Sequence, residues 1–214
     1  GHEFVIEALE KGAVAAIVNR QLSSQLETVK KRLVIVDDTY AALDKLGALG
    51  RENSLGKFIA ITGSVGKTTT KDTLKLILSK YGSSHATYGN QNNLIGVPLT
   101  LSRMPRSHKF GIFELGMNKP GEIQSLSKLV SPDVIIITKI AGVHTEFFSS
   151  VDQIASAKAE IFDGLVSGGV AIIPSDTKYF DMLISLAREK GISKIISFGE
   201  SLKSNARLLS YSIS

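Results

Sequence analysis

Hydrophobic residues recur along the chain in two alternating patterns, which together predict the order of its secondary structure. Short apolar runs are typical of buried strands, and stretches with apolar residues every three or four positions are typical of helices. Such β–α alternation indicates an α/β fold, a mostly parallel sheet covered by helices on both faces. The predicted strands are 13–18, 32–36, 58–61, a short one near 85, 110–115, 133–138, 170–173, 194–198 and the alternating tail 206–213. The predicted helices are 4–9, 39–51, 67–81, 94–103, 120–129, 151–165 and 179–190.

The stretch 53–56, Asn-Ser-Leu-Gly, is the most turn-like sequence before the strand 58–61. We therefore predict a domain boundary there. Residues 1–55 would form part of a small α/β domain, and residues 56–214 would form most of a second, larger one.

The chain is organised around the sequence that follows the strand 58–61. Thr62-Gly63-Ser64-Val65-Gly66-Lys67-Thr68-Thr69 joins an apolar strand to an amphipathic helix through a glycine turn. Glycines let backbone N–H groups approach phosphate oxygens, and the helix N-terminus adds positive potential. Lys67 could reach the outer phosphates and Thr68 a Mg²⁺ ion. Ile61 stands where a generic P-loop begins with glycine, so an ordinary glycine turn is the alternative.

Two side chains follow other predicted strands at the edge of the sheet where ligands gather. Glu114 ends the strand 110–115, where its carboxylate would suit the Mg²⁺ of a triphosphate, or would cap a helix or form an ion pair. His144 follows the strand 133–138. It is a candidate ligand, and equally a packed or surface histidine.

Lys158 interrupts the apolar face of the predicted helix 151–165, where Ile154, Ala155, Ile161 and Phe162 point inward. One interpretation is that its stem packs and its ammonium reaches water. The other is that burial lowers the pKa of the amine and makes it reactive, for example toward CO₂ to give a carbamate.

Composition narrows the class of protein. The 214 residues include 25 Lys and Arg, 20 Asp and Glu and no Cys, giving a formal net charge of +5. The charges are interspersed, so nothing indicates nucleic-acid binding, and the lack of cysteine excludes disulfides. Apolar runs such as 134–137 are too short to span a membrane, and no signal peptide is visible. We therefore expect a cytoplasmic protein.

Several motifs together resemble the Mur ligases, the ATP-dependent amide-forming enzymes of peptidoglycan synthesis. The stretch 62–71 is similar to that family's P-loop, and Ile61 fits its shorter version. The other matching blocks are Gly89-Asn90-Gln91-Asn92-Asn93 with 95–101, Glu114-Leu115-Gly116-Met117 with 120–123, His144 with 146–148, and 157–162. Within the family, the pattern is most similar to members that add D-Ala-D-Ala to UDP-MurNAc-tripeptide.

The resemblance implies roles for the candidate residues. ATP phosphates would contact Gly63, Ser64, Val65, Gly66, Lys67, Thr68 and Thr69. Mg²⁺ would be bound by Thr68, Glu114, His144 and Lys158, the last as a carbamate. Lys67, His144 and Lys158 would be the catalytic residues. Asn90, Asn92 and Asn93 would lie near the muramoyl peptide.

The resemblance also has departures. Leu94 replaces a polar or acidic residue, and 139–143 differ from the family's usual approach to the histidine. Members of the family have three domains, and we expect the full-length enzyme to be a monomer. This chain would supply the end of the N-terminal UDP-substrate domain and an incomplete central ATP-binding domain. We expect this part to be inactive by itself. The alternatives are another Mur-type amino-acid ligase, a folylpolyglutamate synthase-like enzyme, or a nucleotide-binding module without catalysis.

Overall fold

The computed structural model describes residues 1–142 and 148–211 and divides into two compact units, Gly1–Leu46 and Gly47–Ser214. The division falls inside helix α3 (Thr39–Asn53), not at the turn that follows it. The assignment of 1–55 and 56–214 to two family domains stays a prediction. Within the described residues, no helix combines the length and the apolar character that crossing a bilayer requires.

The first unit is a small α/β arrangement around one pair of parallel strands. β1 and β2 pair with Ala16 opposite Leu33, and Val5, Leu9, Val18 and Leu26 form the core. Its elements are η1 (His2–Phe4), α1 (Val5–Glu10), β1 (Ala16–Asn19), α2 (Arg20–Ser23), η2 (Ser24–Arg32), β2 (Leu33–Val36) and the start of α3.

The helices α2 and η2 were not expected from the sequence. The Asn19 side chain caps α2 by accepting a hydrogen bond from the backbone N–H of Gln21 at 2.8 Å. Non-helical dihedral angles at Leu26 then break the regular spacing. A short capped helix joined to 3₁₀ turns leaves no long periodic stripe for sequence reading to detect.

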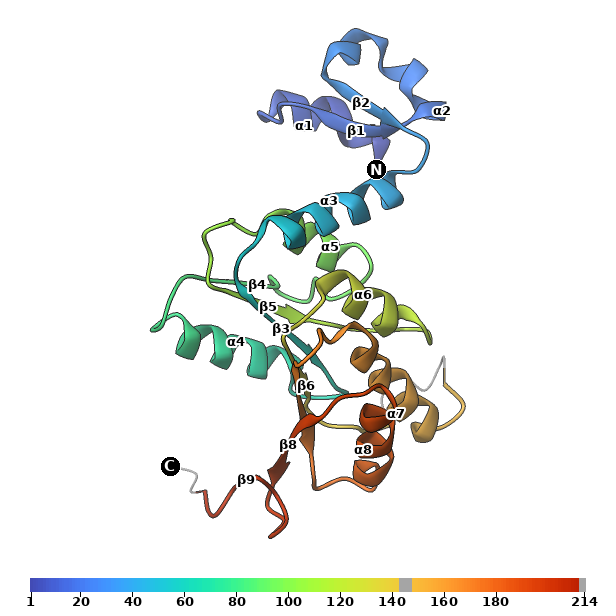
Figure 1. Ribbon diagram of the computed structural model, residues 1–214. Helices are drawn as coiled ribbons and strands as arrows, with labels where there is room; N and C mark the ends of the chain where they lie inside the picture. The colour runs from blue at the N-terminus through green and yellow to red at the C-terminus, as the bar shows by residue number, and fades with distance from the viewer. Residues whose placement is uncertain (143–147, 212–214) are drawn as a thin grey trace. The chain divides into compact units, whose positions relative to one another are not determined.

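The second unit is a seven-stranded parallel sheet in the order β4-β5-β3-β6-β7-β8-β9 (Figure 1). This confirms the predicted α/β class. Its strands are β3 (Lys57–Thr62), β4 (Ser84–Ala86), β5 (Phe110–Glu114), β6 (Val134–Ile137), β7 (Val170–Pro174), β8 (Lys194–Gly199) and β9 (Ala206–Arg207). Its helices are α4 (Lys67–Leu78), α5 (Gly96–Ser102), α6 (Glu122–Val130), α7 (Val151–Ala159), η3 (Glu160–Gly164) and α8 (Phe180–Glu189).

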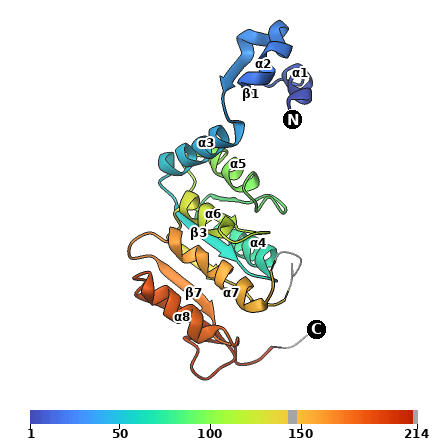
Figure 2. The same cartoon turned by 90° about the vertical axis from the view of Figure 1, so that its right-hand side faces the viewer.

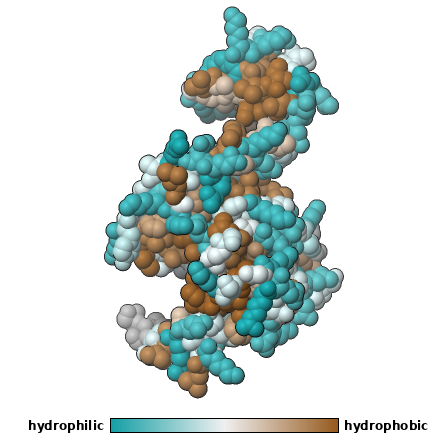
Figure 3. All heavy atoms as spheres, viewed as in Figure 1, coloured by the Kyte–Doolittle hydropathy of each residue, from teal (hydrophilic) through white to brown (hydrophobic). Residues whose placement is uncertain are grey.

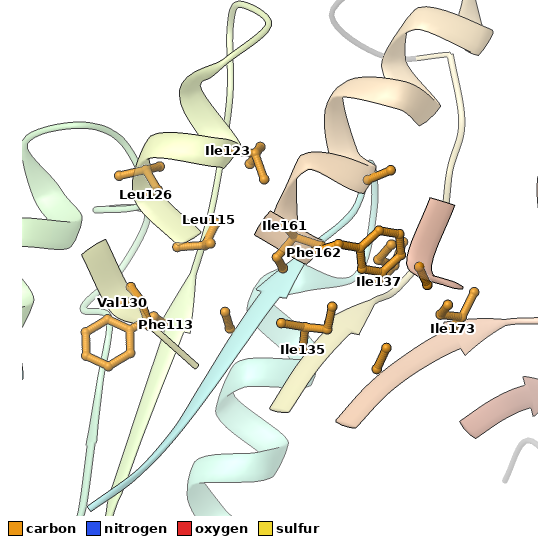
Figure 4. Packing of buried hydrophobic residues seen from close by; sticks show 14 of the residues in the cluster. Phe113, Leu115, Ile123, Leu126, Val130, Ile135, Ile137, Ile161, Phe162 and Ile173 are labelled. Carbon is orange, nitrogen blue, oxygen red and sulfur yellow. The ribbon is translucent and has the colours of Figure 1, made fainter. Parts of the chain in front are cut away.

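One face of this sheet holds the main core, against α5, α6, α7, η3 and α8 (Figure 2). Side chains from β3, β5, β6 and β7 interdigitate there with those of α6 and η3 (Figure 4). Gly164 lies so close to α6 that an added Cβ would be 2.1 Å from the Ser127 backbone. The close approach fixes η3, and with it the end of α7, against α6.

The other face is covered by α4, whose Leu74 and Leu78 pack on Ile59, Ile61, Ile112 and Ile136. Hydrophobic residues also gather at the surface over the part of the sheet near β6 (Figure 3).

Several predicted elements differ in extent from the structure; the strand expected over 13–18, for example, is Ala16–Asn19. α4 ends at Leu78, so Tyr81 is 71% exposed and does not pack on the sheet. The helix expected over 151–165 changes to 3₁₀ geometry at Glu160. Of the strand expected over 206–213, the described residues up to 211 show only Ala206–Arg207 paired with β8.

Candidate functional site

The glycine turn after β3 forms a tight loop that is tied to the segment after β6. Gly63 and Gly66 have φ of +154° and +87°, conformations that favour glycine. A Cβ at Gly63 would lie 1.9 Å from the Thr138 hydroxyl. That hydroxyl donates a hydrogen bond to the Val65 carbonyl at 2.7 Å, and the Ser64 hydroxyl donates to the Ala141 carbonyl at 2.8 Å. The shape of the loop is therefore fixed by the Thr138 side chain and by the backbone of Ala141.

Lys67 is the first residue of α4 and points back over this loop. Its Nζ donates to the Gly63 carbonyl at 2.8 Å. Burial lowers the pKa of the Lys67 amine, and the negative charge of Glu114 partly opposes that change. The amine is thus held beside a loop rich in backbone N–H groups. An anion bound there would be stabilised both by the amine and by these N–H groups. Thr69 lies in the same turn of α4 and is exposed.

Glu114 ends β5 and is 2% exposed. Its Oε2 accepts a hydrogen bond from the Thr68 hydroxyl at 2.9 Å, and its Oε1 accepts one from the Asn92 amide at 2.8 Å. No ion pair involves this carboxylate within residues 1–142 and 148–211. A buried carboxylate without a paired cation, next to a hydroxyl, is a donor set that suits Mg²⁺.

The asparagine-rich loop after β4 meets Glu114 through Asn92. The Asn92 carbonyl also accepts from the Gly116 N–H at 2.7 Å, and a Cβ at Gly116 would lie 2.6 Å from the Asn92 side-chain oxygen. Asn93 caps α5, because its Oδ1 accepts from the N–H groups of Ile95 (3.1 Å) and Gly96 (2.9 Å). Asn90 is exposed.

Lys158 lies on α7, a helix that begins where the Ser150 hydroxyl accepts from the Gln153 N–H at 3.2 Å. The residue is only 4% exposed, so its side chain does not extend to bulk water as one interpretation held. Burial, with a smaller contribution from the positive charge of Lys67, lowers the pKa of the Lys158 amine to about 8.

A cavity of about 250 Å³ is lined by some of these groups, whereas residues 63–66, Thr68, Thr69 and Glu114 are not among its lining residues. It contains five of the residues predicted from the sequence and four to which the sequence assigned no role. The predicted ones are Lys67, Asn90, Asn92, Asn93 and Lys158. The others are Gly116, Met117, Asn118 and Glu122. His144 lies outside the described residues, so its predicted role stays a prediction.

The added lining residues come from the turn between β5 and α6. Glu122 opens α6, and its Oε2 accepts from the Asn118 N–H at 2.7 Å. Glu160 anchors the same turn from η3, with Oε1 accepting from the Gly121 N–H at 2.8 Å. A glycine turn followed by an acidic residue was the available sequence signal, but it indicates a helix start as readily as a cavity.

The second unit has a parallel sheet, a glycine loop between strand and helix, a half-buried lysine over that loop and a carboxylate at the end of the neighbouring strand. Together these features define a P-loop nucleotide-binding domain. Residues 61–212 match the Mur ligase middle domain. The chain belongs to the Mur ligase family.

Relatives and solved structures agree with this assignment. The chain is 40% identical over 211 residues to the UDP-N-acetylmuramoyl-tripeptide–D-alanyl-D-alanine ligase of Rickettsia prowazekii (strain Madrid E), covering 99% of this chain and 46% of the relative. A crystal structure of MurF from Acinetobacter baumannii has a TM-score of 0.81 at 36% identity, covering 94% of this chain and 43% of that one. MurF ligase from Thermotoga maritima in complex with ADP has a TM-score of 0.79 at 29% identity, covering 94% and 44%. The chain thus spans less than half the length of these proteins.

Proposed function

We propose that this chain forms the nucleotide-binding and carboxylate-activating part of a cytoplasmic, monomeric ligase that adds D-Ala-D-Ala to UDP-MurNAc-tripeptide. The observation that carries the proposal is the single cavity lined by the P-loop lysine Lys67, the asparagine loop and the buried Lys158. The name of the Rickettsia prowazekii relative supports the substrates. Since the chain spans less than half of that relative, the reaction is assigned to the complete protein that contains it.

ATP is the proposed nucleotide, with its phosphates on the loop from Gly63 to Thr69. Backbone N–H groups at the start of α4 and the amine of Lys67 supply positive potential there. The Thermotoga maritima relative was solved with ADP, which supports an adenine nucleotide. Binding would replace the hydrogen bond between Lys67 and the Gly63 carbonyl by one to phosphate, exchanging a neutral acceptor for a charged and stronger one.

Thr68 and Glu114 are the proposed Mg²⁺ ligands among the described residues. The described residues hold no cluster of three His, Asp or Glu side chains, so phosphate oxygens and water would complete the shell, as is usual for Mg²⁺. When bound, Mg²⁺ would neutralise charge that develops on the transferred phosphoryl group. His144 is a further proposed ligand.

Lys158 is proposed to act as a carbamate. Its lowered pKa leaves a substantial fraction of neutral amine near pH 8. The nitrogen forms a bond to the carbon of CO₂, one C=O bond pair moves to oxygen, and a proton leaves the nitrogen. The product is a carboxylate at a position where the free lysine would place a second cation beside Lys67. The negatively charged oxygens of this carboxylate would be suitable ligands for a second Mg²⁺.

The proposed reaction has two steps. A carboxylate oxygen of the tripeptide bonds to the γ-phosphorus of ATP, while the bond from that phosphorus to the bridging oxygen breaks and ADP forms. The amine of D-Ala-D-Ala then attacks the acyl carbon, phosphate leaves, and the nitrogen loses a proton. Lys67 would stabilise charge during the first step. Asn90, Asn92 and Asn93 would orient the tripeptide.

Phosphate release from ATP by the complete protein tests this function. We expect release only when UDP-MurNAc-tripeptide and D-Ala-D-Ala are both present, and loss of release in Lys67→Ala. Single amino acids in place of the dipeptide are the matched control, since they are substrates expected of other Mur ligases. Release without the dipeptide, or equal release with one amino acid, would contradict the substrate assignment.

A further inference from the structure

Lys71 is the second lysine of the P-loop helix, and it is buried, whereas Lys67 is only half-buried. It lies one turn beyond Lys67, and its side chain is 3% exposed. Its Nζ donates to the Thr87 carbonyl at 2.9 Å and lies 3.5 Å from the Gly89 carbonyl. Asp72, the paired carboxylate at 3.2 Å, is 62% exposed. A cation buried near a helix N-terminus is unfavourable unless its partners are specific.

These partners are the first residues of the asparagine loop. The loop has little apolar packing to hold it, since Tyr88 is 82% exposed and Leu94 and Ile95 are about half exposed. Its far end is fixed by the Asn93 cap on α5. Its near end is fixed by Lys71. The loop is therefore held between two polar anchors.

Thr87 connects the Lys71 anchor to the carboxylate of the site. Thr87 is 2% exposed, and its hydroxyl accepts from the Glu114 N–H at 3.0 Å while its carbonyl accepts from Lys71. Glu114 in turn accepts from Thr68 and from Asn92. A continuous set of hydrogen bonds thus runs from the P-loop helix through Thr87 and Glu114 to Asn92, and closes through Thr68 on the same helix.

We infer that Lys71 is a positioning residue that holds the asparagine loop in place for the acyl substrate. It does not line the cavity. It acts through the Thr87 and Gly89 carbonyls, which set where the loop leaves β4 and so where Asn90 and Asn92 stand relative to Glu114. The kinetic part of this inference rests on the proposed function, whereas the structural part does not.

Hydrogen exchange of the complete protein, without substrates, tests the structural part. Lys71→Met keeps the side-chain volume and removes the donor to both carbonyls. We expect faster exchange of the backbone amides over 88–92, with β3 and α5 unchanged. Lys75→Met, an exposed lysine one turn further along α4, is the matched control and should leave the loop unchanged. Unchanged exchange over 88–92 in Lys71→Met would overturn the inference.

Steady-state kinetics test the functional part. Lys71→Met should raise the KM for UDP-MurNAc-tripeptide roughly tenfold, while the KM for ATP changes less than about twofold. Lys71→Gln, which keeps one donor, should show a smaller rise. A uniform loss of kcat with a lower Tm and faster exchange across α4 and β3 would make Lys71 merely structural and overturn the inference. Absence of dipeptide-dependent turnover in the unmutated protein would instead contradict the proposed function.

Discussion

Two lysines of the larger unit are almost equally buried and yet have different surroundings. Lys71 is 3% exposed and donates to a backbone carbonyl beside a carboxylate. Lys158 is 4% exposed, and the described residues offer its amine no hydrogen bond or ion pair. The nearby charge that acts on it is the positive one of Lys67.

The difference shows that depth of burial alone does not decide what a lysine does. Carbonyl and carboxylate oxygens replace the water that the Lys71 side chain loses on burial, so its hydrogen bonds can fix a loop. No described residue replaces the water that Lys158 has lost, and burial shifts its pKa toward the neutral form. One lysine is thus suited to positioning and the other to covalent modification.

The largest expected effect follows from removing Lys158, the proposed carbamate. Lys158→Ala in the complete protein should lower kcat on the order of 10³-fold, because the proposed carbamate and its charge are lost. Adding acetate or formate should restore part of the activity, since a small carboxylate can occupy the space left by the proposed carbamate. Dipeptide-dependent phosphate release is the measurement.

Lys71→Ala provides the contrast for this experiment. It should lose less activity and gain nothing from added carboxylate, because its role needs a donor. Equal rescue of both variants would remove the distinction between the two lysines.

The next effect is on stability and its dependence on pH. In CO₂-free buffer the folded-state pKa of Lys158 is about 8, below the usual 10.5. Below pH 8 both states bind the proton and the folded protein bears the full cost of the buried charge. Between about pH 8 and 10.5 the unfolded state binds more protons, so the free energy of unfolding rises with pH.

Lys158→Met removes this cost. It should be more stable than the unmutated protein at pH 7, by at most about 3 kcal/mol, and the gain should shrink as the pH approaches 10. Urea unfolding at pH 7 and 9.5 measures both values. A gain that is independent of pH would show that the buried amine is not the cause.

The smallest expected effect concerns the helix that carries Lys158. Ser150→Ala removes the hydroxyl that accepts from the Gln153 N–H and should cost about 1 kcal/mol of stability. Ser156→Ala, on the same helix, is the control. It should change the stability little, because the Ser156 hydroxyl donates to the Asp152 carbonyl one turn earlier in the helix and caps no free N–H group. Thermal melting of both variants gives the comparison. Equal shifts in Tm would contradict the capping role.

Local patterns in the sequence predicted those features of the structure that depend on residues close together in the chain. The strand–loop–helix at Gly63–Lys67 and the inward place of Lys158 followed from glycine spacing and an apolar stripe. Lys71 stands in a similar stripe, before Leu74 and Leu78 on α4, and is buried as Lys158 is.

Contacts between distant segments could not be predicted in this way. The bonds from Glu114 to Thr68 and Asn92 join three separate segments, and they depend on a strand order, β4-β5-β3-β6, that alternation does not determine. The family resemblance pointed to these residues. Their geometry could be seen only in the folded structure.

The hydrogen bond between Lys67 and the Gly63 carbonyl has a thermodynamic consequence for nucleotide binding. Together with the Thr138 and Ser64 contacts, it leaves the loop little conformational freedom to lose. The entropic cost of ordering the loop is then met when the protein folds and not when the nucleotide binds. Nucleotide binding should accordingly proceed in one fast step whose observed rate rises linearly with nucleotide concentration, without the slow phase of a segment that must first become ordered.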